Sequence, residues 1–418
     1  MDHAAKLYTA VADVTNSCTF RLAAYMTEQV DLEKLQRATD KTLQRFRTFN
    51  VYLAKGFFWS YLRDSTSRLI VEEESDYPAA LIEVGTPGAH LLRVFAFGRR
   101  IGVEFFHAVT DGSGGLEFLK SLLHTYLSLD SDFIPTEDKV VAADSWPRLG
   151  EDSDSFEEYR AYCKEIGASP AGSPPPARRV KGTNFDIHGH NVTELIVPAK
   201  NLTEAAHKYG VTVSGFLTAV TLAALAQTTR EIPGNDPFIV AMPLNLRRAL
   251  PSRTFRNFFA VARIGYTCAP DDPFTVLATK VKAEIGAALT LESIATTVNE
   301  TTQFDGSLPA RFTPNVVKRR AIRYGFRHFS ENNSSVTLSN LGNVVLPSGM
   351  TDRVERLSFN LYSSPQAPLA IAVVSYGDIA TISFTRCYVE SDFVRAFAEL
   401  LVQHDCNDVS VTGNQWGV

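Results

Sequence analysis

Cysteine is scarce in this chain, and none of it is paired along the sequence. The 418 residues contain five cysteines, which lie far apart and form no Cys-x-x-Cys motif: Cys18, Cys163, Cys268, Cys387 and Cys406. An odd and scattered set is not typical of a disulfide framework or of a zinc site, and it fits the reduced thiols of a cytosol. We therefore expect a cytoplasmic protein.

Long apolar runs and an excess of positive charge are also missing. No stretch reaches the roughly 18 consecutive apolar residues of a membrane span, and residues 1–18 lack the basic segment and apolar core of a secretory signal. The formal net charge of -5 argues against a polyanion as the main partner. We expect no membrane span, no secretory signal and no nucleic-acid partner.

Motifs of several common enzyme classes are absent. Gly112, Gly114 and Gly115 lack the lysine and spacing of a phosphate-binding loop, and they do not form a dinucleotide fingerprint. Gly-x-Ser-x-Gly, the nucleophile motif of α/β-hydrolases, does not occur. His188 and His190 flank a glycine, but no nearby carboxylate or cysteine completes a metal-ligand spacing, so we expect no metal site.

The composition that remains is that of a soluble globular protein, with 45% hydrophobic and 21% charged residues. Strand-like and helix-like patterns occur in mixed order, which favours an α/β (α+β layered) fold. We predict an N-terminal half over 1–150, a linker over 151–180 that is rich in Ser and Pro, and a C-terminal half over 181–418. Each half offers a strand–helix–strands grouping, so we expect two related halves, each a mixed sheet with flanking helices.

The predicted elements follow this division. In the first half we predict a helix from Asp31 and strands at 18–27, 49–54, 57–62, 90–97 and 100–106, with a loop over 72–88. In the linker we predict one short helix at 154–166. In the second half we predict helices near 199–209, 213–230, 272–302, 313–329 and 391–403, and strands near 190–197, 237–245, 257–267, 334–340, 353–361, 368–376 and 379–387.

The most informative stretch is 101–119, IGVEFFHAVTDGSGGLEFL. An apolar strand ends at Phe106, His107 and Asp111 follow in a turn, and helical spacing begins at Ser113, which we expect to cap the helix. A histidine at a strand end can act as a general base, because its ordinary pKa near 6.5 leaves it mostly neutral at pH 7 and able to accept a proton. The alternative is a purely structural turn, because Asp and Gly are favoured in turns for conformational reasons.

This stretch resembles a known signature. HAVTDG resembles the His-x-x-x-Asp-Gly motif of the chloramphenicol acetyltransferase-like superfamily, which includes the BAHD acyltransferases, the condensation domains of peptide synthetases and the alcohol acetyltransferases. Two further segments resemble that group: AMPLNLRRALPSRTFRNFFAV at 241–261 and SNLGNVVLP at 339–347. The order of elements fits over 20–397, and the resemblance is greatest to bacterial alcohol acetyltransferase-like proteins.

The resemblance implies roles for individual residues. It implies that His107 is the general base, next to Gly112 of the same motif, and that Asp111 points away from the substrate and pairs with an arginine. Arg247 is the candidate partner. Asn257, Asn340 and Ser339 complete the implied set: the two asparagines shape the site and Ser339 donates to the thioester oxyanion. For Arg247 a surface position, and for the other three a strand end or turn, remain open alternatives.

The resemblance also implies an activity. An acyl group, most simply acetyl, would pass directly from acyl-CoA to a hydroxyl or amine acceptor in a channel between the halves, without a covalent acyl-enzyme. Acyl-CoA is then a co-substrate, and no permanently bound cofactor or metal is needed. Condensation domains usually carry two adjacent histidines, and Phe106 replaces the first of them here.

Two alternatives to this activity stay open. One is a condensation-type enzyme that uses a donor bound to an acyl carrier protein, and the other is a non-catalytic binding protein on the same fold. The basic stretch 318–328, KRRAIRYGFRH, either meets coenzyme A phosphates or an acidic carrier protein, or is a solvated helix face.

Overall fold

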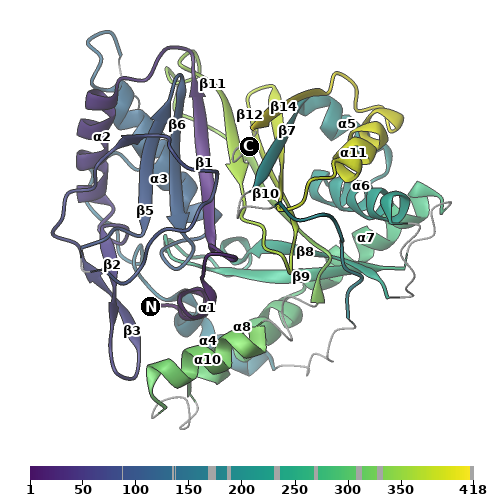
Figure 1. The fold of residues 1–418 in the computed structure, drawn as a ribbon, viewed down its shortest axis with the longest axis horizontal. Coiled ribbons are helices and arrows are strands. Elements are labelled where there is room, and N and C mark those ends of the chain that lie inside the picture. Colours follow the sequence, from purple (N-terminus) through teal and green to yellow (C-terminus); the bar gives the residue numbers. More distant parts are fainter. Residues whose placement is uncertain are drawn as a thin grey trace.

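Two β-sheets, each covered by helices, form two lobes that lie side by side (Figure 1). The computed structural model describes residues 1–418 except 87, 134–135, 137, 168–175, 186–189, 230–235, 268–271, 307–312, 327–332 and 415–418. The two large sheets contain both parallel and antiparallel pairs, and β2 and β3 form a separate two-stranded antiparallel sheet. The predicted α/β architecture of two mixed sheets with flanking helices is thus confirmed.

The first lobe is built mainly from the N-terminal part of the chain. Its sheet has the strand order β11-β1-β6-β5-β4, and its elements are α1 (His3–Val11), β1 (Thr19–Met26), α2 (Leu32–Arg45), β2 (Val51–Lys55), β3 (Ser60–Asp64), β4 (Glu72–Glu73), β5 (Leu92–Phe97), β6 (Arg100–Phe106), α3 (Gly112–Leu127) and α4 (Ser155–Ile166). Every residue of β6 is buried, because β1 and β5 flank it and α3 packs across the sheet.

The second lobe holds a larger sheet, with the strand order β14-β7-β13-β12-β10-β8-β9. Its elements are β7 (Asn191–Pro198), α5 (Ala199–Lys208), α6 (Val213–Thr228), β8 (Phe238–Asn245), η1 (Leu246–Arg248), β9 (Phe259–Tyr266), α7 (Phe274–Ala288), α8 (Leu291–Gly306), α10 (Asn315–Gly325), β10 (Val336–Val344), β12 (Leu369–Tyr376), β13 (Ile379–Arg386), α11 (Asp392–Gln403) and β14 (Ser410–Asn414). Helix α6 is apolar on all sides and forms the centre of this lobe's core.

Helix α6 also bears on the question of membrane spans. Among the residues that the structure describes, no single helix is long and apolar enough to cross a membrane. Within the described ranges one pair of helices, α5 and α6, reaches the required length and composition together, and the two are bent by 79° relative to each other.

One strand of the second half does not stay with its own sheet. β11 (Val354–Asn360) pairs antiparallel with β1, with Leu357 opposite Ala24, and so forms an edge of the first sheet. The predicted halves, divided at residues 150 and 181, therefore do not coincide with the two large sheets, because a strand of the C-terminal half belongs to the first sheet. The pattern of β11 predicts a strand, but which sheet the strand joins depends on edge pairing and not on its own residues.

Four further details differ from the sequence-based expectation. Asp111, and not Ser113, caps α3, which begins at Gly112. The short helix predicted at 154–166 is confirmed as α4, but its Phe156 and Cys163 pack with residues of α8 into a small core, which was not expected of a linker. The predicted loop 72–88 begins with the short strand β4. Helix α1 and strand β14 were not predicted, and both are short.

The loop between β8 and β9 joins the two lobes. Phe255 from this loop lies in the core of the first lobe, within 5.0 Å of Phe46 between ring centroids. The backbone N–H of Phe255 donates to the carbonyl oxygen of Glu151 at 2.8 Å, and the Glu151 carboxylate accepts two hydrogen bonds of 2.8 Å from Arg45. Phe255 therefore fixes the loop against the first lobe, directly beside the turn that follows β6.

Candidate active site

The turn after β6 places His107 at the junction of several elements. Its backbone N–H donates to the carbonyl oxygen of Cys18 at 2.8 Å, which extends the pairing of β6 with β1 by one residue. The imidazole is partly buried. Tyr8 of α1 stacks on it with ring centroids 4.3 Å apart, and Phe20 of β1 and Phe259 of β9 lie at 5.1 and 5.6 Å. Aromatic rings from three elements thus hold the imidazole in place.

Asn257 selects the tautomer of His107. The amide nitrogen of Asn257 faces two groups that accept hydrogen bonds, the carbonyl oxygen of His107 at 3.0 Å and the carboxylate of Asp2 at 3.3 Å. Its amide oxygen lies 3.0 Å from Nδ1 of His107. Because that oxygen can only accept, Nδ1 must carry the proton. The lone pair is then on Nε2, which is the arrangement that a general base requires.

Asp2 orients Asn257 from the start of α1. Its side chain caps the helix by accepting from the backbone N–H of Ala5 at 2.7 Å, and it is almost completely buried. Burial is the main reason that the pKa of Asp2 rises to about 6, and the carboxylate of Asp154 raises it further. The hydrogen bonds from Ala5 and Asn257 oppose this rise. At neutral pH the carboxylate is still mostly ionised and accepts from Asn257.

The environment of His107 also keeps it neutral. Loss of solvation is the largest effect and lowers the pKa of His107 below its ordinary value of 6.5. Hydrogen bonds with its own backbone and the negative charge of Asp111 act in the opposite direction and do not outweigh it. The imidazole is therefore available as a proton acceptor at neutral pH.

Asp111 is saturated with hydrogen-bond donors. Its Oδ1 accepts from the backbone N–H groups of Ser113 and Gly114 at 3.1 and 3.0 Å, which caps α3. Its Oδ2 accepts from Nη1 of Arg247 at 2.8 Å and from the backbone N–H of Phe258 at 2.9 Å. Four donors fill the four lone-pair positions of a carboxylate. Asp111 therefore connects the turn to the β8–β9 loop and has no lone pair left for a substrate.

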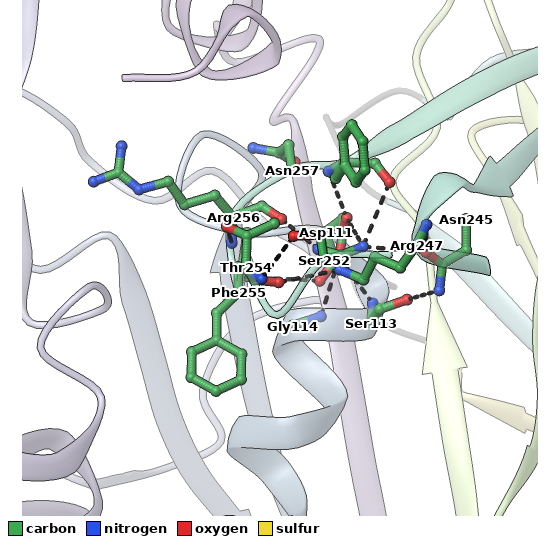
Figure 2. A network of polar contacts seen from close by, with 12 residues as sticks. Asp111, Ser113, Gly114, Asn245, Arg247, Ser252, Thr254, Phe255, Arg256 and Asn257 are labelled. Atoms are coloured by element: carbon green, nitrogen blue, oxygen red, sulfur yellow. Dashed lines mark hydrogen bonds and ion pairs between the residues drawn. The ribbon is translucent and has the colours of Figure 1, made fainter. Parts of the chain in front are cut away.

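Arg247 is the centre of the β8–β9 loop, as Figure 2 shows. Besides Asp111 it donates to the backbone carbonyl groups of Thr254 at 3.1 Å and of Arg256 at 2.5 Å. The Arg247 side chain is 14% exposed and the Asp111 side chain 7%, so this is a largely desolvated ion pair. The structure thus places Arg247 where it holds the loop closed around its own side chain and against the turn of His107.

The glycines of the motif allow close approach. A Cβ atom on Gly112 would lie 2.8 Å from Leu341 of β10, and one on Gly114 would lie 2.2 Å from the carbonyl oxygen of Phe255. Both contacts come from the C-terminal half of the chain. Glycine at these two positions therefore lets the second half pack directly on the start of α3.

Ser339 and Asn340 lie on β10, beside the same junction. Asn340 precedes an irregularity in the pairing of β10 with β12. Its amide oxygen accepts from the backbone N–H of Gly342 at 2.8 Å, and its nitrogen donates to the hydroxyl of Ser214 at 3.0 Å. Leu341, the next residue along β10, lies against Gly112. The side chain of Asn340 thus shapes the backbone here, while the oxyanion role of Ser339 stays a prediction.

Sequence reasoning did not find Asp2 and Tyr8. The only signal in that region is Asp2 as a helix cap ahead of HAAKLYTAV, and it says nothing about a contact with His107.

His190, considered as a metal ligand and then set aside, is buried with Nδ1 at 2.7 Å from the hydroxyl of Ser363, and His188 lies outside the described residues. Burial lowers the pKa of His190 to about 4, so it remains neutral.

The geometry defines the class of fold. The chain has the two-lobed fold of condensation domains and related acyltransferases, with a histidine turn at the junction of the lobes. The predicted resemblance to the chloramphenicol acetyltransferase-like superfamily is therefore confirmed at the level of the fold. No family model and no curated protein matches the sequence.

Three solved structures illustrate this similarity. The polyketide synthase associated protein 5 from Mycobacterium tuberculosis has 15% identity and a TM-score of 0.62, over 98% of this chain and 97% of its own. The first condensation domain of the CDA synthetase has 15% identity and a TM-score of 0.61, over 99% and 98%. The trichothecene 15-O-acetyltransferase from Fusarium sporotrichioides has 12% identity and a TM-score of 0.60, over 96% and 94%.

Proposed function

We propose that this protein is an acyltransferase that moves an acyl group, most simply acetyl, from an acyl-CoA thioester to a hydroxyl or amine. The observation that carries the proposal is the chain of hydrogen bonds from Asp2 through Asn257 to Nδ1 of His107. A histidine with one nitrogen held in this way and a lowered pKa is suited to accept a proton through the other nitrogen. The similarity of the fold to an O-acetyltransferase adds support.

The proposed reaction has two steps at one centre. Nε2 of His107 takes the proton from the acceptor hydroxyl while the acceptor oxygen attacks the thioester carbonyl carbon. The tetrahedral intermediate then expels the thiolate, which takes the proton back from the imidazolium, so that an ester and a free thiol form. Direct transfer needs no acyl-enzyme. Positioning of both substrates and the base supplies the rate enhancement, and Ser339 is the proposed donor to the oxyanion.

The structural residues have a defined part in this proposal. Asp111 and Arg247 hold the turn and the β8–β9 loop together, and so keep Asn257 in place beside His107. They do not take part in proton transfer. Acyl-CoA is a co-substrate in this scheme, and neither a bound metal nor a permanently bound cofactor has a role.

The decisive experiment measures thiol release. Acetyl-CoA and longer acyl-CoAs are offered with a panel of alcohols and amines to the parent protein, to His107→Ala and to the control His207→Ala, which changes an exposed histidine on α5. Acceptor-dependent release that falls by about 10²–10⁴ in His107→Ala alone is the expected result. Near-normal turnover of His107→Ala would remove this residue from the mechanism.

Carrier-bound donors are the second candidate, favoured by the similarity to the CDA condensation domain. Phe106, which replaces the first histidine of such domains, is fully buried in the core of the first lobe and contributes no polar atom. If no acyl-CoA leads to thiol release but a carrier-bound thioester does, the hypothesis of a condensation-type enzyme holds. If neither does, a non-catalytic binding role follows.

A further inference from the structure

A surface formed by the β2–β3 hairpin of the first lobe and by α10 combines exposed apolar groups with positive charge. The tip of the β2–β3 hairpin and α10 lie side by side there, at the opposite end of the molecule from α11 (Figure 1). Asn315 at the start of α10 joins them: its backbone N–H donates to the carbonyl oxygen of Phe57 at 2.8 Å, and its side chain donates to Gly56 and Ser60 at 3.3 and 3.0 Å. The two segments thus form one surface.

This joint is strengthened by Trp59. The ammonium groups of Lys6 and Lys318 lie 5.2 and 3.2 Å from the centre of its indole ring, which is within the range of cation–π attraction. Trp59 therefore points into the protein and anchors the hairpin to α1 and α10. The aromatic residues next to it in the sequence are left on the outside.

Six large apolar side chains of these two segments are exposed: Phe57, Phe58, Tyr61, Val316, Val317 and Tyr324. Phe57 is 74% exposed, and Val316 and Tyr324 are each 63% exposed. Phe57 and Phe58 pack edge to face at the tip, with ring centroids 4.8 Å apart. Single exposed apolar residues are ordinary, but a contiguous group marks an interaction surface.

The charges of the surface are of one sign. Residues 55–63 and 313–326 contain no Asp or Glu. Of their six cations, Lys55, Arg63 and Arg320 are exposed, Arg319 and Arg323 are partly buried, and Lys318 is buried against Trp59. The next acid along the hairpin, Asp64, lies at its base, opposite Val51. The whole chain has a net charge of -5, so this concentration does not follow from the overall composition. This combination favours a partner that is anionic and that also accepts apolar side chains.

We propose that this surface, the hairpin tip with α10, binds peripherally to an anionic lipid bilayer. Phe57, Phe58 and the two valines enter the boundary between headgroups and acyl chains, and the arginines of α10 meet the anionic headgroups. The surface protrudes at a hairpin tip and combines aromatic with aliphatic groups, which suits a deformable lipid interface. This mode of binding requires no membrane-spanning helix.

The test uses co-sedimentation with vesicles. The full chain is mixed with phosphatidylcholine–phosphatidylserine vesicles and with pure phosphatidylcholine vesicles, at low and high NaCl. We expect binding to the anionic vesicles that weakens with salt. Phe57→Ser with Phe58→Ser is expected to weaken it about ten-fold or more, and Arg320→Gln about five-fold.

Matched controls lie on α11, where Val402 is 49% exposed and Arg395 is exposed near the helix start. Val402→Ser and Arg395→Gln are expected to bind as the parent does, and unchanged circular dichroism checks the folding of every variant. Failure of the parent to bind anionic vesicles would overturn the proposal. So would binding that the phenylalanine variant retains, or binding to a soluble acidic carrier protein in place of vesicles.

Discussion

Replacing Asp111 with asparagine exchanges one carboxylate oxygen for an NH₂ group and leaves the size of the side chain unchanged. Asparagine can still cap α3 with its remaining oxygen. Its NH₂ group would then face Nη1 of Arg247 and the backbone N–H of Phe258, which are both donors. The substitution therefore removes the counter-ion of a largely buried guanidinium and places donors against donors.

The expected loss of stability follows from this geometry. Removing one member of a buried ion pair is worth about 3–5 kcal/mol. Arg247 is 14% exposed and regains some solvation, so we expect about 3 kcal/mol, or roughly a 100-fold change in the folding equilibrium. The assay is urea unfolding at pH 7, read as a lower midpoint with an unchanged slope. The control Asp392→Asn, in an exposed pair with Arg395 on α11, should change stability by less than about 1 kcal/mol.

A double-mutant cycle with Arg247→Gln isolates the pair itself. If the two residues act together, the double variant loses clearly less than the sum of the two single variants. A loss below about 1 kcal/mol for Asp111→Asn would refute the structural role argued here. Because the charge of Asp111 raises the pKa of His107, its loss alone should move the acid limb of the rate profile to lower pH. A clean shift of the basic limb would show, instead, that Asp111 takes part in proton transfer.

Three more predictions rest on the same region. Because burial lowers the pKa of His107, the acid limb of the activity profile should lie below pH 6.5, and a limb above it would contradict the desolvated base. Burial raises the pKa of Asp2 from 3.8 to about 6, so the folded state favours the protonated carboxyl. Its contribution to stability is fully present below pH 4 and is lost as pH rises through 6. Asp2→Asn should abolish this pH-dependent decrease in the free energy of unfolding, which amounts to about 3 kcal/mol. An identical pH dependence of stability in the variant and the parent would refute this prediction. Gly114→Ala should destabilise strongly in thermal melts, since its Cβ meets Phe255, whereas Gly286→Ala has open space and should be neutral or stabilising; equal melting temperatures would contradict the close packing.

Local features of this protein could be predicted because neighbouring residues determine them. The alternation of apolar residues before His107 specifies a strand, and the spacing from Leu116 to Leu127 specifies a helix, so the turn between them follows directly. The cap was placed at Ser113 in place of Asp111, an error of two residues, because both are good capping residues and only the backbone geometry distinguishes them.

Only the tertiary structure decided what surrounds the histidine. Asn257 lies 150 residues from His107 along the chain and 255 from Asp2, and nothing in the pattern of either segment refers to the other. The placement of β11 in the first sheet was decided in the same way, by the free edge of β1. Sequence periodicity records which face of an element is apolar, whereas the tautomer of His107 depends on three side chains that meet only when both lobes pack around the β8–β9 loop.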